Sequence, residues 1–265
     1  MRRVVHLSDL HFGRDRPELL APLITAVNAL EPDLVAISGD LTQRAKSVQF
    51  RAALAFLECL QAPVLVVPGN HDIPLHNPFA RIVRPWRQYR SHISPQLEPS
   101  FRDDELIVLG INTVNRFTHQ SGRVSLRALA RIERALDGAK RRTCLIIAHH
   151  PLEQLVTDRK RPTRGAERAK DMLAQIGVDA VLSGHLHSWR AEPYAHTDGR
   201  NTVLQIHAGT GLSTRQRGEE NDFNLLDIDV GSITVTRHTA SAETESFVQS
   251  QTRRFILGDG GWSLV

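Results

Sequence analysis

Apolar and polar residues follow two different rhythms along the first two thirds of the chain. Short apolar runs are typical of buried β-strands, and longer stretches with apolar residues three or four positions apart predict amphipathic helices. Because the two kinds alternate, we expect a layered α/β domain with a largely parallel sheet. The predicted strands are 4–7, 34–38, 64–67, 106–111, 144–148 and 180–182, and the predicted helices are 17–30, 44–60, 125–136 and 166–176.

The rhythm changes after Gly184, where apolar runs follow one another with no helical stretch between them. This pattern predicts a second, mainly antiparallel sheet packed on the first, with Val230-Gly231 at one of its turns. Its predicted strands are 203–207, 223–230, 233–239 and 244–249.

Two segments, 76–100 and 112–122, show no clear periodicity. Long irregular loops in a compact domain are often functional, so we expect these two segments to determine which substrate the protein binds. Trp86 and Tyr89 in the first segment could stack on a nucleobase, although hydrophobic anchoring of the loop is the plainer interpretation.

The length of 265 residues fits a single domain. Within it we expect 1–187 to carry the chemistry and 188–252 to supply the strands of the second sheet. The tail, 253–265, contains Gly258-Asp259-Gly260-Gly261 and fits either a loose terminus or an arm at an interface.

The composition of the chain indicates in which cellular compartment the protein is found. No segment approaches the roughly 20 apolar residues that span a bilayer, and the short apolar run after Arg2-Arg3 does not resemble a secretory signal. Cys59 and Cys144 lie in apolar runs that favour buried thiols over a disulfide. We therefore expect a cytoplasmic protein without a membrane span.

The net charge of +4, with a sequence pI near 9.5, suits a partner that carries phosphate. Basic residues are densest between 159 and 170, where they could contact the substrate or form a solvated face. They are Arg159, Lys160, Arg161, Arg164, Arg168 and Lys170.

Side chains that can bind metals gather at the carboxyl ends of predicted strands. These ends meet at one crevice in an open parallel sheet, so five separate clusters would arrive at the same place. The clusters are Asp9-Leu10-His11, Gly39-Asp40, Gly69-Asn70-His71-Asp72, His149-His150-Pro151 and Gly184-His185-Leu186-His187.

The residue types in these clusters suit a pair of ions. Asp9 and His11 can face one ion from a strand end, and the two oxygens of Asp40 can bridge two ions. Asn70 adds a neutral oxygen, while His149, His185 and His187 add imidazole nitrogens. Mixed nitrogen and oxygen ligands favour Mn, Fe, Zn or Co over Mg or Ca. Glycines at 39, 69 and 184 allow sharp turns beside the metals.

The five clusters, in this order, resemble the motif set of the calcineurin-like metallophosphoesterases, over residues 9 to 187. The resemblance implies a four-layer α/β/β/α sandwich of two mixed β-sheets, with the metal site at the carboxyl ends of the strands. It also implies two divalent metal ions, Mn or Fe foremost, with Zn or Co as alternatives. Asp9, His11, Asp40 and His187 would hold one ion, and Asp40, Asn70, His149 and His185 the other.

The metal-binding histidine of the fourth cluster and the residue that assists catalysis each have to be chosen from several candidates. His149 and His150 are adjacent and only one should bind metal; the family block usually reads His, any residue, Pro, which with Pro151 favours His149. His71 is our candidate for stabilising charge on the phosphoryl group or protonating the leaving group. His207, which precedes Ala208-Gly209-Thr210-Gly211, could line the pocket.

Within this family, the sequence most resembles class III cyclic nucleotide phosphodiesterases and glycerophosphodiesterases. The shared segments are Leu7-Ser8-Asp9-Leu10-His11, Pro68-Gly69-Asn70-His71-Asp72 and His149-His150-Pro151. This resemblance implies hydrolysis of a small phosphodiester, 3',5'-cyclic AMP or a glycerophosphodiester, by a hydroxide that bridges the metals. A nuclease that binds nucleic acid, a phosphomonoesterase and a non-catalytic protein-binding scaffold are the alternatives. A homodimer is left open.

Overall fold

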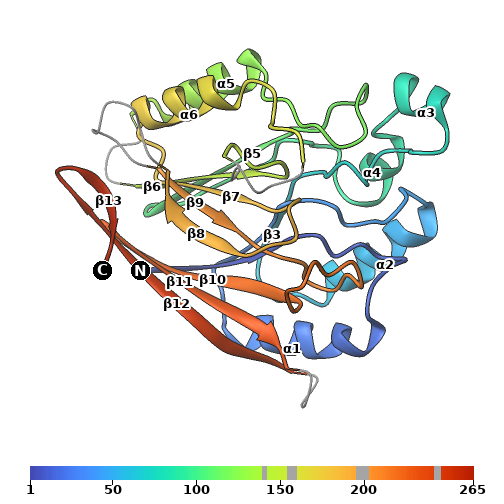
Figure 1. Cartoon of the computed structure of the whole chain (residues 1–265), viewed down its shortest axis with the longest axis horizontal. Helices are drawn as coiled ribbons and strands as arrows, with labels where there is room; N and C mark the ends of the chain where they lie inside the picture. Colours follow the sequence, from blue (N-terminus) through green and yellow to red (C-terminus); the bar gives the residue numbers. More distant parts are fainter. Residues whose placement is uncertain (139–141, 154–159, 195–202, 242–245) are drawn as a thin grey trace.

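Two β-sheets lie face to face, and a pair of helices covers the outer face of each, which makes four layers (Figure 1). This arrangement is seen in a computed structural model that describes residues 1–138, 142–153, 160–194, 203–241 and 246–265. The predicted α/β/β/α sandwich with two mixed sheets is confirmed.

The seven-stranded sheet joins the two ends of the chain. Its parallel half contains β1, β2 and β3, linked by α1 and α2, and its antiparallel half contains the last four strands of the chain. The order across the whole sheet is β13-β12-β11-β10-β1-β2-β3. The bounds are β1 Arg2–Leu7, α1 Leu20–Ala29 after a 3₁₀ turn at Pro17–Leu19, β2 Leu34–Ile37, α2 Ser47–Glu58, β3 Val64–Val66, β10 Asp222–Asp229, β11 Ser232–Ala240, β12 Phe247–Gly258 and β13 Gly261–Leu264.

The six-stranded sheet has the order β4-β5-β6-β7-β9-β8, with antiparallel strands at both edges and four parallel strands between them. Two further short helices, α3 and α4, follow β3 on the side of the molecule where the parallel strands end (Figure 1). The bounds are α3 Pro78–Val83, α4 Arg87–His92, β4 Ser100–Arg102, β5 Leu106–Ile111, α5 Leu126–Leu136, β6 Thr143–Ala148, α6 Ala166–Gln175, β7 Ala180–Ser183, β8 Arg190–Pro193 and β9 Leu204–His207.

Three apolar cores separate the four layers. Val4 of β1 faces the core between the sheets, while Val5 and Leu7 face the core beneath α1 and α2. A third core lies between the second sheet and α5 with α6. Strands with both faces buried need apolar residues at successive positions, which explains the uninterrupted apolar runs in the sequence.

The prediction that the strands after Gly184 form a second sheet of their own is wrong. β10 pairs antiparallel with β1, with Val5 opposite Leu225, so the last four strands extend the first sheet. β8 and β9 instead join β5, β6 and β7 in the other sheet. Apolar periodicity identifies a strand but does not say which free edge it will pair with.

The tail and one of the irregular segments are also more ordered than expected. Residues 253–265 form most of the β12–β13 hairpin, so they are not a loose terminus, and a place at an interface stays a prediction. The segment 76–100 contains α3 and α4. The strand predicted at 244–249 begins at Phe247, and 244–245 lie outside the described residues.

Two further expectations concern the thiols and the membrane. Cys144 is buried, whereas Cys59, next to the end of α2, is exposed; both are free. Among the described residues, no helix combines the length and apolarity needed to cross a bilayer.

Candidate metal centre

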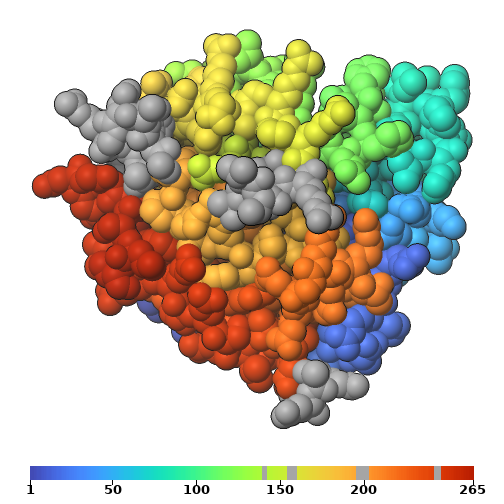
Figure 2. Space-filling model, in the orientation of Figure 1, coloured from blue at the N-terminus to red at the C-terminus, as the bar shows by residue number. Residues whose placement is uncertain are grey.

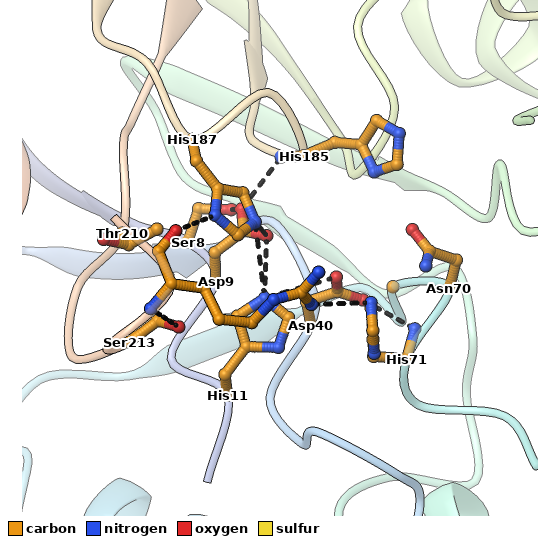
Figure 3. A network of polar contacts seen from close by, with 12 residues as sticks. Ser8, Asp9, His11, Asp40, Asn70, His71, His185, His187, Thr210 and Ser213 are labelled. Atoms are coloured by element: carbon orange, nitrogen blue, oxygen red, sulfur yellow. Dashed lines mark hydrogen bonds and ion pairs between the residues drawn. The ribbon is translucent and has the colours of Figure 1, made fainter. Parts of the chain in front are cut away.

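The seven predicted metal ligands come from the loops that follow five strands, three in one sheet and two in the other. Asp9 and His11 follow β1, Asp40 follows β2, and Asn70 follows β3; His149 follows β6, and His185 and His187 follow β7. All seven are buried. The side chains of Asp9, His11, Asp40 and His187 converge on one region (Figure 3). The two sheets thus bring their carboxyl ends to a common site.

Five of these seven residues have a left-handed backbone. This conformation is rare for residues other than glycine and costs about 1–3 kcal/mol each when the surroundings impose it. Elsewhere in the described chain, only Glu31 and Ala45 share it among non-glycine residues. Strain of this kind gathers at functional sites, where it orients side chains. The φ angles are 51° at Asp9, 52° at His11, 50° at Asp40, 70° at His185 and 61° at His187.

One group of ligand atoms forms around Asp9. Its Oδ1 lies 3.1 Å from Nε2 of His187 and 3.4 Å from Nε2 of His11. The two imidazole nitrogens are themselves 3.4 Å apart. Three atoms with lone pairs therefore face one small volume.

A second group forms around His149. Its Nε2 lies 3.1 Å from Oδ1 of Asn70 and 3.1 Å from Nδ1 of His185. Oδ2 of Asp40 stands between the two groups, 3.4 Å from Nε2 of His149 and 3.7 Å from Nε2 of His11. Asp40 is thus the carboxylate that both groups share.

Hydrogen bonds from outside the site hold the ligands in this orientation. Nδ1 of His149 donates to the carbonyl of Ser38 at 2.8 Å, and Nδ1 of His187 donates to the carbonyl of Arg215 at 2.8 Å. Since a carbonyl only accepts, the hydrogen of each ring lies on Nδ1 and the Nε2 lone pair faces the site.

The carboxylates are held in the same way. Oδ2 of Asp9 accepts hydrogen bonds from Oγ of Ser8 at 2.7 Å and from the backbone N–H of His185 at 2.8 Å. Oδ1 of Asp40 accepts from the backbone N–H of His71 at 2.8 Å. The second oxygen of each carboxylate is left for the interior of the site.

The charge balance of the site calls for cations. No lysine or arginine of the described chain forms an ion pair with Asp9 or Asp40, although both are buried. Buried carboxylates without a cationic partner are costly, and lone pairs that face one another repel. The donor set therefore fits bound metal ions, and its nitrogens and oxygens suit a first-row transition metal.

His150 lies beside the second group but has other contacts. Its Nδ1 pairs with Oγ1 of Thr113 at 2.8 Å, and Nε2 has no hydrogen-bond partner in the described structure. The ring packs against His185, with centroids 4.5 Å apart. Unlike His149, it forms no hydrogen bond with Asp40 or Asn70 in the described structure.

His71 stands at the edge of the site with one nitrogen committed. Its Nδ1 donates to the carbonyl of Gln43 at 2.9 Å, so Nε2 carries a lone pair, which accepts from Nη1 of Arg215 at 3.0 Å. Burial lowers the pKa of His71 to about 4 against the opposing effect of Asp40. The ring packs edge-on against His11.

Two cationic side chains, Lys160 and Arg215, lie beside the site and come from different parts of the chain. Nζ of Lys160 donates to the carbonyl of His185, and burial lowers the pKa of Lys160 to about 8. Lys160 was one residue of the predicted basic stretch, whereas Lys170 of that stretch pairs with Glu167 on α6 at 3.0 Å. Arg159 lies outside the described residues.

Sequence reasoning missed Arg215, which follows β9. A signal was present, because the glycine-containing segment Ala208-Gly209-Thr210-Gly211 follows a parallel strand and so lies at the same edge as the metal clusters.

Two other candidates lie elsewhere. His207 is fully buried, and its ring has no hydrogen-bond partner in the described structure, so it does not join either group. Tyr89 is also fully buried and donates its hydroxyl hydrogen to the carbonyl of Val66 at 3.0 Å. It anchors its segment and is not free to stack on a base, whereas stacking by the half-buried Trp86 stays a prediction.

The glycines of the motifs are needed for two different reasons. Gly39 has a φ of +94°, as the expected sharp turn requires. Gly69 and Gly184 instead allow close approach, since a Cβ at Gly69 would lie 2.1 Å from Oδ1 of Asp40, and one at Gly184 would lie 2.4 Å from Oδ2 of Asp9. The absence of a side chain at these positions makes room for the carboxylates.

Comparisons with known proteins agree with this geometry. A family model described as calcineurin-like phosphoesterase matches residues 2–189. The glycerophosphodiester phosphodiesterase GpdQ of Enterobacter lignolyticus is 24% identical over 219 residues, 77% of this chain and 77% of that protein. The 3',5'-cyclic adenosine monophosphate phosphodiesterase CpdA of Escherichia coli K12 is 27% identical over 199 residues, 70% of this chain and 69% of that protein.

The fold has a counterpart among solved structures. A dimetal phosphatase from Danio rerio has a TM-score of 0.68 at 12% sequence identity, covering 94% of this chain and 98% of that chain. The matched family model spans every cluster from Asp9 to His187, and its members use divalent metals. The chain belongs to the calcineurin-like phosphoesterase family and is a hydrolase that acts on phosphoric esters.

Proposed function

We propose that the protein is a binuclear metal-dependent phosphodiesterase that cleaves small phosphodiesters. The observation that carries the proposal is the position of Asp40, whose Oδ2 is 3.4 Å from His149 on one side and 3.7 Å from His11 on the other. A carboxylate between two groups of ligand atoms suits a pair of ions that share it.

Each group would hold one ion. The first ligand set is Asp9, His11, Asp40 and His187, and the second is Asp40, Asn70, His149 and His185. His149 is preferred to His150 because its Nε2 already lies against Asn70 and Asp40, while His150 pairs with Thr113. Mn or Fe are the proposed metals, with Zn or Co as alternatives. When bound, two such ions lower the pKa of a water molecule and neutralise charge on phosphoryl oxygens.

The chain supplies the remaining groups. His71 holds its hydrogen on Nδ1 against Gln43 and points a lone pair into the site, where it would contact the reacting ester. Arg215, 3.0 Å from that lone pair, can donate charge-assisted hydrogen bonds to a phosphoryl oxygen. Lys160 adds a third polar contact near His185. Arg215 and Lys160 would bind and orient the single negative charge of a diester, whereas His71 would stabilise that charge or protonate the leaving group once its Nε2 carries a proton.

The identity of the substrate is proposed from the relatives of the chain. 3',5'-cyclic AMP and glycerophosphodiesters are the best candidates, supported by the names of the two relatives. A nuclease or phosphomonoesterase of the same family is the alternative.

The test combines metal analysis with a substrate panel. Purified protein should contain two equivalents of transition metal, and with added Mn it should cleave bis(p-nitrophenyl) phosphate faster than p-nitrophenyl phosphate. The panel should then rank cyclic nucleotides, glycerophosphodiesters and single-stranded DNA. A preference for the monoester would overturn the diesterase proposal, and intact protein that binds no metal would favour the non-catalytic scaffold.

A further inference from the structure

Four large apolar side chains lie exposed together on one part of the surface. Three belong to α3, where Phe79 is 77% exposed, Val83 53% and Ile82 49%; the fourth, Phe117, is 71% exposed. We call α3 together with residues 115–118 the cap. In Figure 2 these segments, teal and green, form the upper right corner of the molecule. Single exposed apolar residues are common, but a group of them marks an interaction site.

The cap is held rigidly in this exposed position. The buried guanidinium of Arg81 donates to the carbonyls of Pro74 at 3.0 Å and Arg116 at 2.9 Å, and also to that of Thr118. Arg116 in turn donates to the carbonyl of Ile82 at 2.9 Å. These bonds connect α3 to the 115–118 loop and so fix the backbone that presents the apolar side chains to solvent.

The segments that form and flank the cap are rich in arginine and contain no acidic residue, although one of these arginines, Arg131, pairs with Glu98 at 3.3 Å. Segments 73–97 and 112–132 contain eight arginines and no aspartate or glutamate, although the whole chain has a net charge of only +4. Exposed arginines in these segments include Arg84, Arg87, Arg90, Arg116 and Arg123. Apolar side chains surrounded by arginines complement a surface that is apolar beneath and anionic outside.

We propose that the cap binds the surface of an anionic lipid bilayer. Phe79, Ile82, Val83 and Phe117 would enter the boundary between headgroups and acyl chains, while the surrounding arginines contact lipid phosphates. Single-stranded nucleic acid fits less well, because Ile82 and Val83 have no flat face on which a base can stack.

The position of the cap relates this surface to the metal centre. α3 follows closely after His71 and Asp72, and the 112–122 segment carries Thr113, which contacts His150. Binding through the cap would therefore place the metal centre near the lipid surface. The inference concerns attachment and goes beyond the proposed hydrolysis, so it holds or fails independently of any activity measurement.

Vesicle sedimentation tests the proposal. The wild-type protein should sediment with equimolar phosphatidylcholine and phosphatidylglycerol vesicles at low salt and remain in solution with phosphatidylcholine alone. High salt should weaken the binding, because screening removes the contribution of the arginines. The double variant Phe79→Ser/Ile82→Ser should bind about tenfold more weakly or worse, as should Arg84→Gln/Arg87→Gln.

Matched controls separate the cap from general surface effects. Val230→Ser/Val248→Ser removes exposed apolar side chains far along the chain, and Arg51→Gln/Arg168→Gln removes exposed charges from α2 and α6. Both controls should bind like wild type, and unchanged unfolding temperatures would show that all variants are folded. Absence of wild-type binding to anionic vesicles, equal losses in the controls, or tighter binding to single-stranded DNA than to vesicles would overturn the proposal.

Discussion

Nη1 of Arg215 lies 3.0 Å from Nε2 of His71, while the backbone carbonyl of the same arginine accepts a hydrogen bond from Nδ1 of His187 at 2.8 Å. One residue of the loop after β9 thus contacts the candidate catalytic histidine through its side chain and orients a candidate metal ligand through its backbone. The two contacts can be separated by substitution, because only the first depends on the guanidinium.

Arg215→Gln should therefore reduce kcat/KM without loss of metal. A charge-assisted hydrogen bond to a phosphoryl oxygen is worth about 1.5–3 kcal/mol, which corresponds to roughly a tenfold to hundredfold reduction in rate. Steady-state kinetics and metal analysis of the same sample measure both quantities. Arg217→Gln, at an exposed position two residues along, is the control and should change the rate little. Loss of metal from Arg215→Gln would instead assign the side chain a structural role.

Asp40→Asn should abolish activity and release metal from both positions. The substitution keeps the size of the side chain and its acceptor for the His71 backbone N–H, but removes the charge that both groups of ligands share. We expect kcat to fall about a thousandfold or more, because the reaction would lose the contribution of both metal ions. Metal content by mass spectrometry and diesterase assay check the result. A variant that retains two metals and most of the rate would refute the shared-carboxylate arrangement.

The adjacent histidines allow a paired comparison. His149→Ala should lose one metal and most of the activity, because its Nε2 contacts Asp40 and Asn70. His150→Ala should keep both metals, since Nδ1 of His150 faces Thr113. Metal stoichiometry of the two proteins, prepared side by side, decides between them. The reverse pattern would exchange the two assignments.

Gly184→Ala tests the close packing around Asp9. A Cβ at Gly184 would lie 1.8 Å from Oγ of Ser8 and 2.4 Å from Oδ2 of Asp9, so the carboxylate must move. Overpacking of this kind costs about 1–3 kcal/mol, and displacement of Asp9 should also lower metal affinity. Gly258→Ala is the matched control, since nothing lies within 4 Å of its added Cβ. Equal unfolding free energies for the two variants would contradict the argument.

Asp179, away from the metal centre, should make stability depend on pH. Burial raises the pKa of its carboxyl to about 6, against the hydrogen bond that it accepts from the backbone of Cys144 at 2.7 Å. Between about pH 4 and pH 6 the native state therefore binds more protons than the unfolded chain, so stability falls as the pH rises through this interval.

The difference between a pKa of about 6 and the ordinary value of an aspartate corresponds to roughly 3 kcal/mol, and partial exposure of Asp179 should reduce the observed change to ~1 kcal/mol. Asp179→Asn should lack this component. Urea unfolding at several pH values measures the difference between the two proteins. A difference that stays constant from pH 4 to pH 7 would show that the carboxyl has an ordinary pKa in the native state.

The sequence by itself determined the parallel strands and helices of the first two thirds, and it identified the residues that meet at the candidate metal centre. Both depend on local patterns: a strand buried on both faces needs a continuous apolar run, and a ligand at a strand end follows that run directly. Asp9, His11 and Asp40 could be found in this way because each stands next to the strand that positions it.

The tertiary structure alone decided how distant segments combine. Pairing of β10 with β1 depends on which sheet edge is free once the domain closes, and local periodicity does not encode that edge. The position of Arg215 beside His71 likewise depends on loops that meet only after folding, as does the binding of Arg81 to three carbonyls within and next to the cap. Hydrogen bonds between segments far apart in the chain leave no spacing in the sequence, because their geometry is set by the packing of the two sheets.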